Sequence, residues 1–245
     1  MKFQSIFFIQ ISLILFYGSD AQVRPDFINS GKVEYERKIN VHASIEGDFA
    51  EEFKKRIPQY KTEYFNFEFA NNRSIYKPGR ESSDKVGFFT SPGSDNEIYT
   101  DLSTKRYTAM KQVFDKTYLI EDSTRKCTWK ISNEIRMISG YNCRKATTII
   151  MDSVFVVAFY CDQIIMSGGP ESFSGLPGLI LGLVIPRLHT TWYATKVEPL
   201  YAKEAHLSPP VKGKKINNTD LLKILKTSLK DWGKYGERNI WSIML

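Results

Sequence analysis

Hydrophobic and polar residues alternate along much of the chain, which is the pattern of strands with one buried face. Apolar side chains fall at positions 33, 35, 39 and 41, and Phe65, Phe67 and Phe69 also repeat every second residue. Polar residues and glycines separate further short β-prone runs, at 98–101, 107–114, 117–120, 127–131, 143–150, 154–160 and 189–197. This spacing predicts a mainly β protein in which an antiparallel meander forms a partial barrel or sandwich.

Two segments have helical spacing instead. Apolar residues step by four across 49–57 and stop at Pro58, which predicts a short helix. Thr219 and Asp220 resemble an N-cap for a second helix over 221–235, with leucines and Trp232 on its buried face. Since helices and strands do not alternate, we expect two helices at the periphery of the β structure rather than a parallel α/β fold.

Turn-forming residues dominate 77–96, where Pro, Gly, Ser and Asp surround a short Val-Gly-Phe-Phe segment. This composition predicts a mobile loop region.

The N-terminal segment has the features of a secretory signal. An apolar run over 6–17 follows the cation Lys2. As a helix this run would span about 18 Å, which is shorter than the roughly 30 Å core of a bilayer. It therefore favours a cleavable signal peptide over a permanent membrane span.

Small side chains at Ser19 and Ala21 suit the −3 and −1 positions of signal peptidase cleavage, so we expect the cut before Gln22. Residues 1–21 are then the signal peptide, and 22–245 are one β-rich domain with no further apolar stretch long enough for a transmembrane span. We expect an exported protein of the periplasm, with outer-membrane association or secretion as alternatives.

The chain carries a formal net charge of +7, with basic clusters at 54–56 and 212–215. Nucleic-acid-binding surfaces usually combine such cations with aromatic side chains that stack on bases, and these clusters mostly lack aromatic residues. We expect no nucleic-acid partner. Anionic envelope surfaces are a better match for the charge.

The most constrained segment is a turn rich in glycine and proline over 167–181. Glycines permit positive φ and close backbone approach, whereas prolines fix φ, so this composition predicts a tightly specified turn rather than a linker. We assign a binding or structural role to Gly169, Pro170, Gly175, Leu176, Pro177 and Gly178.

The string GLPGLIL at 175–181 resembles the signature of the GLPGLI family, a group of exported proteins typical of Bacteroidetes. The segment GYNCRKAT at 140–147 resembles the upstream strand of that family, and GGPESF at 168–173 resembles the segment that leads into the signature. The similarity extends from about Trp129 to Val197. It implies a β-rich envelope protein and no established activity; cysteines at positions 127 and 161 are not part of the family pattern.

The three cysteines are Cys127, Cys143 and Cys161, an odd number for an oxidising compartment. Cys143 and Cys161 lie symmetrically about Asp152, so a three-residue hairpin loop at 151–153 would place them opposite each other on adjacent strands. They are either a disulfide or two buried small hydrophobic residues.

Two kinds of site chemistry remain open as alternatives. A hydrolase could combine Ser172 or Ser174 with His189 and an acid, Asp162 or Glu171. However, no G-x-S-x-G motif is present, so Glu171 and His189 are only candidates and no catalytic residue is assigned.

A metal-handling protein could use Cys143 and His189, but the chain has no close pair of ligands, so we expect no metal and no cofactor. The sequence favours a non-enzymatic protein that binds a small apolar ligand or an envelope protein, with the turn at 168–181 forming one edge of its site.

Overall fold

A computed structural model describes residues 27–82, 91–200 and 207–245. The expected signal peptide and the central part of the loop expected at 77–96 lie outside these ranges.

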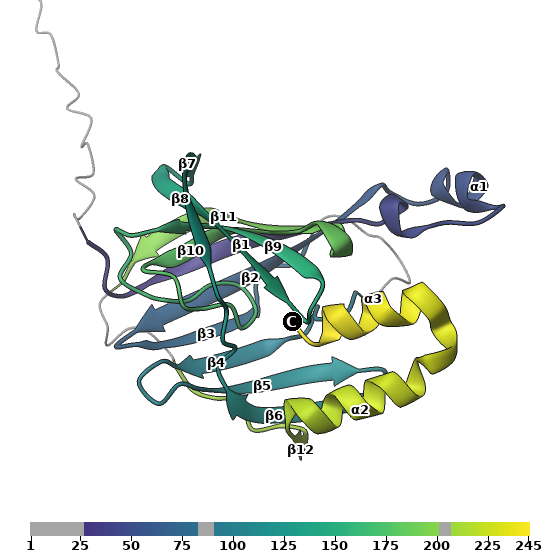
Figure 1. Ribbon diagram of the computed structural model, residues 1–245. Helices are drawn as coiled ribbons and strands as arrows, with labels where there is room; N and C mark the ends of the chain where they lie inside the picture. Colours follow the sequence, from purple (N-terminus) through teal and green to yellow (C-terminus); the bar gives the residue numbers. More distant parts are fainter. Residues whose placement is uncertain (1–26, 83–90, 201–206) are drawn as a thin grey trace, which may run out of the picture.

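The described strands form one curved, open sheet of twelve strands, which confirms the expected mainly β, partial-barrel architecture. Their order is β12-β6-β5-β4-β3-β2-β1-β11-β10-β9-β8-β7, and all pairs are antiparallel except β12 with β6. The sheet does not close into a barrel, because β12 and β7 stand at opposite ends (Figure 1). The strands are β1 (Gly31–Asn40), β2 (Tyr60–Ala70), β3 (Arg73–Pro78), β4 (Glu97–Asp101), β5 (Arg106–Val113), β6 (Lys116–Ser123), β7 (Lys130–Ile138), β8 (Tyr141–Ile150), β9 (Val154–Cys161), β10 (Leu179–Ile185), β11 (Thr190–Pro199) and β12 (Lys214–Ile216).

The alternation of the central strands places large aromatic side chains on the buried face. Phe65, Phe67 and Phe69 of β2 are each at most 2% exposed, as expected from their period of two. Phe65 stacks on Tyr76 of β3 with ring centroids 4.8 Å apart. Trp192 of β11, also buried, donates a hydrogen bond from Nε1 to the Tyr76 hydroxyl at 3.2 Å. These contacts fill the centre of the sheet.

Three α-helices accompany the sheet in the described ranges: α1 (Ala50–Lys54), α2 (Asn218–Ser228) and α3 (Gly233–Ile243). The helix α1 lies within the predicted 49–57 segment and extends from the β1–β2 connection, whereas α2 and α3 lie beside the sheet (Figure 1).

The single helix expected over 221–235 is wrong, because the chain turns between α2 and α3. The helix α2 ends at Ser228, and Gly233, with a φ of +51°, redirects the chain at the start of α3. The N-cap is Asn217, whose side chain accepts a hydrogen bond from the backbone of Asp220 at 2.9 Å. Trp232 lies at the corner and is 56% exposed, so it does not belong to the buried face that its spacing had suggested. Because of this corner, α3 returns toward the interior of the curved sheet (Figure 1).

Within the described ranges, no helix has the length and apolar character needed to cross a bilayer.

Candidate functional site

The turn rich in glycine and proline connects β9 to β10 and packs into the interior of the protein. Phe173 and Leu176 are at most 2% exposed, whereas Gly175 and Pro177 are exposed. Trp129 donates a hydrogen bond from Nε1 to the backbone oxygen of Ser174 at 2.9 Å. The turn is thus held by its own side chains and by a tryptophan from outside it.

Little free space adjoins the first residues of this turn, Gly168 and Gly169. A cavity of about 10 Å³ lies beside Gly168 and Gly169. This is at the lower limit for one water molecule. Gly169 and Pro170 are buried, and a Cβ on Gly169 would lie 2.7 Å from the Cβ of Ile180. The close packing indicates that this part of the turn fills the core.

Glu171 is the buried acid of the turn and has a left-handed φ of +56°. Its Oε2 accepts a hydrogen bond from Asn96 Nδ2 at 2.8 Å, and its Oε1 lies 3.8 Å from Nη1 of Arg37. Glu171 therefore belongs to a buried ionic network, and the cavity that it lines is the one of about 10 Å³.

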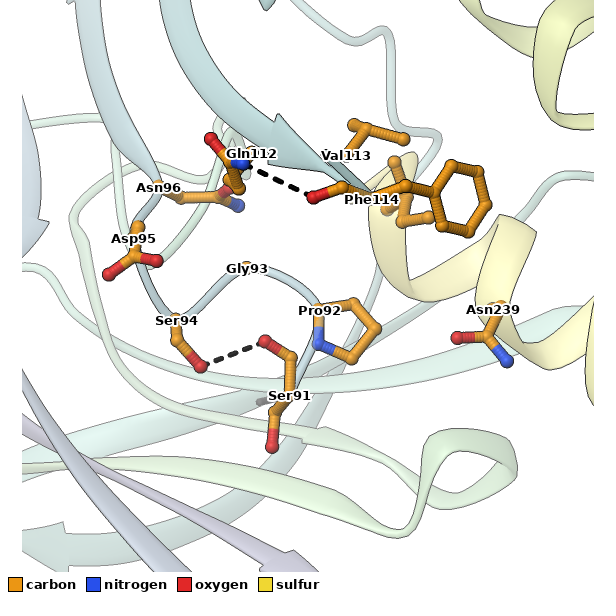
Figure 2. A pocket seen from close by; sticks show the side chains of 11 residues that line it. Ser91, Pro92, Gly93, Ser94, Asp95, Asn96, Gln112, Val113, Phe114 and Asn239 are labelled. Carbon is orange, nitrogen blue, oxygen red and sulfur yellow. Dashed lines mark hydrogen bonds between the residues drawn. The ribbon is translucent and has the colours of Figure 1, made fainter. Parts of the chain in front are cut away.

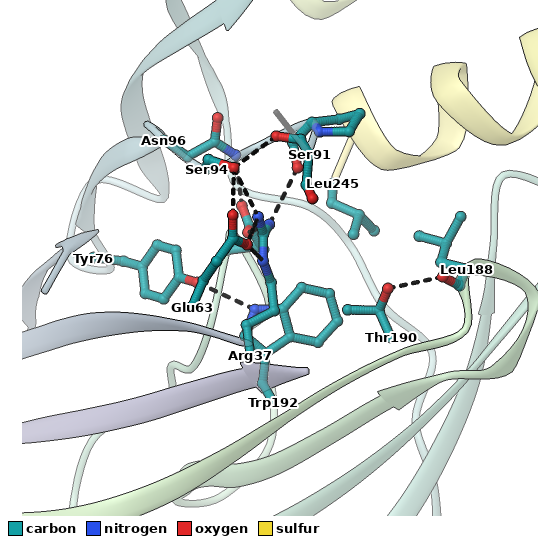
Figure 3. A network of polar contacts seen from close by, with 12 residues as sticks. Arg37, Glu63, Tyr76, Ser91, Ser94, Asn96, Leu188, Thr190, Trp192 and Leu245 are labelled. Atoms are coloured by element: carbon teal, nitrogen blue, oxygen red, sulfur yellow. Dashed lines mark hydrogen bonds and ion pairs between the residues drawn. The ribbon is translucent and has the colours of Figure 1, made fainter. Parts of the chain in front are cut away.

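Arg37 is the centre of that network, shown in Figure 3. Its Nε donates to Glu63 at 2.7 Å, and its Nη1 donates to the Pro92 oxygen at 3.2 Å. Lys61 also pairs with Glu63 at 2.9 Å. Burial alone would lower the pKa of Arg37, but the Glu63 carboxylate, with a smaller contribution from Glu171, raises it. Arg37 therefore stays charged in the interior.

His189 lies elsewhere, in the turn directly before β11, with a left-handed φ of +52°. Its backbone oxygen accepts a hydrogen bond from the backbone of Asn40 at 2.9 Å. Burial and the positive charge of Arg238 lower the pKa of His189, whereas Glu46 acts in the opposite direction. Glu171 and His189 thus have different neighbours, and the structure shows no hydrogen bond or ion pair between them among the described residues.

The strands β8 and β9 form a hairpin with the three-residue loop that was expected because Cys143 and Cys161 are equally far from Asp152. Residues 151–153 connect the strands, and Arg144 pairs with Tyr160. Continuing this register by one residue places Cys143 opposite Cys161. Both thiols are free and buried, and a hydrogen bond between them, together with burial, raises the pKa of Cys143. The same hydrogen bond lowers the pKa of Cys161.

The described residues contain no group of three or more His, Cys, Asp or Glu side chains arranged to hold a metal ion. Cys143 has Cys161 as its neighbour, whereas His189 lies near Arg238 and Glu46.

A cavity of about 350 Å³ lies between α3 and the ends of β1 and β11. Its volume is within the range of small-molecule pockets. Thr190 and Trp192 of β11, seen in Figure 3, line one side, and Ile39 of β1 lines another. We call this space the α3 cavity. Its further lining residues are Arg37, Val41, Ser44, Ile45, Lys61, Ser91, Pro92, Leu188, Tyr235, Arg238, Asn239, Ser242 and Leu245.

A second, more polar cavity of about 470 Å³ adjoins it. Figure 2 shows its lining from the 91–96 segment, from Gln112 and Phe114 at the end of β5, and from Asn239 of α3. Ser91, Pro92 and Asn239 border both cavities. The turn at 168–181 contributes no lining residue to either one.

Sequence reasoning missed the α3 cavity because its walls come from distant segments. One signal was present: Arg37 follows Val33 and Tyr35 at the inward positions of an alternating strand. A charged residue in such a position needs a buried partner or a ligand.

The structure thus defines an open, curved antiparallel-sheet protein with a solvent-open cavity beside its last helix. The model of a family described as a protein of unknown function, Porph_ging, matches residues 150–182, which comprise β9, the turn and the start of β10. No curated protein matches the sequence significantly.

Solved structures of a protein named PNGF-II, in two crystal forms, have a similar fold. One gives a TM-score of 0.52 at 16% identity and the other 0.50 at 14%, and each covers 84% of this chain. The chain spans about a third of those structures, 34% and 33%. At this level of identity the likeness shows the fold alone.

Proposed function

We propose that this protein is an exported envelope protein that binds a small apolar ligand in the α3 cavity. The observation that carries the proposal is a cavity of about 350 Å³, half of whose lining residues are apolar or aromatic. Ile45, Leu188 and Trp192 supply part of these walls. Pockets of this size and composition bind small molecules mainly through apolar contact.

Export and family membership complete the proposal. Residues 1–21 would direct export to the periplasm, and the mature chain would begin at Gln22. The segment at 175–181 supports membership of the GLPGLI family, and the match of a family of unknown function over 150–182 includes this segment. N-terminal sequencing of the protein recovered from the periplasm tests the export step, because an uncleaved chain would contradict it.

Binding is tested with N-phenyl-1-naphthylamine, a neutral probe whose fluorescence rises in apolar surroundings. We expect saturable binding to the wild-type protein. Ser242→Phe should weaken it, because Ser242 lines the cavity from α3 and a phenyl ring would occupy that space.

Ser228→Phe is the matched control, since Ser228 is an exposed serine at the end of α2. Equal binding by both variants and the wild type would place the probe outside the cavity. Absence of saturable binding by the wild type, for this probe and for longer-chain neutral lipids, would overturn the proposal.

A further inference from the structure

One helix face lines the α3 cavity. Tyr235, Arg238, Asn239 and Ser242 border it from α3. Their spacing of three and four residues places them on the same side of the helix. The helix thus presents polar and cationic groups to a cavity whose opposite walls are largely apolar.

The charged side chains that line the cavity all have the same sign. They are Arg37, Lys61 and Arg238, and no carboxylate side chain is among the lining residues. Glu63, behind the wall, pairs with both Arg37 and Lys61, and Glu171 is a second carboxylate beside Arg37. These two cations are therefore balanced from within the protein.

Arg238 differs from the other two. Its Nη1 is buried and has no hydrogen-bond partner in the described part of the chain. The carboxylate within its electrostatic influence is Glu46, but Glu46 forms an ion pair with Lys234. Arg238 lines the cavity, and a guanidinium whose hydrogen bonds are incompletely satisfied favours an acceptor supplied from outside the chain.

Resting on the proposed function, we propose that the ligand of the α3 cavity is a small amphipathic carboxylate. The carboxylate accepts from the guanidinium of Arg238, which lines the cavity, and the apolar body packs on the walls formed by Leu188 and Trp192. An N–H group that donates to a carboxylate forms a stronger hydrogen bond than one that donates to a neutral acceptor. The arrangement therefore selects the anion over a neutral molecule of the same length.

The test is a competition between the neutral probe and three ten-carbon ligands: decanoate, decanol and decylammonium. With the wild-type protein, decanoate should displace the probe at a concentration about tenfold lower than decanol, and decylammonium should compete least. In Arg238→Gln, decanoate and decanol should compete within about twofold of each other, while the probe still binds.

Two variants separate a role for Arg238 from general effects of charge. Arg238→Lys keeps a cation and should retain part of the preference for decanoate. Arg187→Gln removes a cation that stacks over Trp241 and does not line the cavity, so its selectivity should equal that of the wild type.

The outcomes distinguish this inference from the proposed function. If the probe binds in the cavity but wild-type protein shows no preference for decanoate, the inference is overturned and the binding function stands. A preference that survives in Arg238→Gln also overturns it. If neither the probe nor decanoate binds, both proposals fail together.

Discussion

Replacing Gly178 with alanine should destabilise the protein severely, whereas the same change at Gly175 should be mild. Both glycines belong to the turn, and both have positive φ, +147° and +95°. A Cβ on Gly178 would overlap the backbone oxygen of Cys161 and lie 2.9 Å from Cα of Asp162. The nearest atom to a Cβ on Gly175 is Nε1 of Trp129, at 3.5 Å, which is an ordinary contact.

From these distances, the two substitutions should lower the free energy of unfolding by different amounts. Alanine at Gly175 carries mainly the cost of a left-handed residue, about 1–2 kcal/mol. At Gly178 the conformational cost is about 1–3 kcal/mol. Backbone displacement to relieve the overlap adds about 1–3 kcal/mol. The expected loss for Gly178→Ala is therefore about 2–6 kcal/mol, a large share of the roughly 5–15 kcal/mol that stabilises a typical domain. The gain from a less flexible unfolded chain is the same for both and cancels.

Urea unfolding of the two variants, followed by tryptophan fluorescence, measures this difference. The midpoint for Gly178→Ala should fall well below that for Gly175→Ala, with similar slopes. Equal midpoints would refute the reasoning, since they would mean that the backbone of Cys161 and Asp162 does not confine Gly178.

Three further predictions concern other parts of the fold. Burial lowers the pKa of Lys111 from its ordinary 10.5 to about 8, so the unfolded chain binds more protons between these values. Stability should rise by about 3 kcal/mol from pH 8 to 10.5, and urea midpoints of Lys111→Met should lack this rise. Asn217→Ala removes the cap that accepts from Asp220, and should lower the free energy of unfolding by about 1 kcal/mol in urea titrations. If Cys143 and Cys161 form a disulfide on export, denatured periplasmic protein should contain one free thiol, and reduction should cost about 3 kcal/mol of stability; three free thiols would contradict the bridge.

The strands with one buried and one exposed face were predicted close to their observed positions. Alternation placed β1 and β2 within a few residues of their observed ends, because the pleat converts a period of two directly into burial. The symmetry of Cys143 and Cys161 about Asp152 also gave the observed register of the β8–β9 hairpin. A tight loop leaves little freedom, so local sequence was sufficient there.

The strands that were missed or misplaced lack the alternation between a buried and an exposed face. In β7, all residues except Ile138 are exposed, because the strand stands at the end of the sheet. It was expected at 127–131 and lies instead at Lys130–Ile138. In β3, three consecutive buried residues, Ser74, Ile75 and Tyr76, interrupt any alternation. Both strands are positioned by their neighbours rather than by their own pattern.

The turn and the α3 cavity are separate features, but one guanidinium connects them. Glu171 projects from the turn toward Nη1 of Arg37, and Arg37 in turn lines the cavity. The turn therefore influences the cavity from behind its wall, by supplying charge to Arg37, and not by contact with a ligand. This arrangement leaves Arg238, on the opposite side of the cavity, as the lining cation with an unsatisfied buried donor. The sequence alone could not show this division, because Arg37 and Arg238 come from opposite ends of the chain and meet only after the sheet curves around α3.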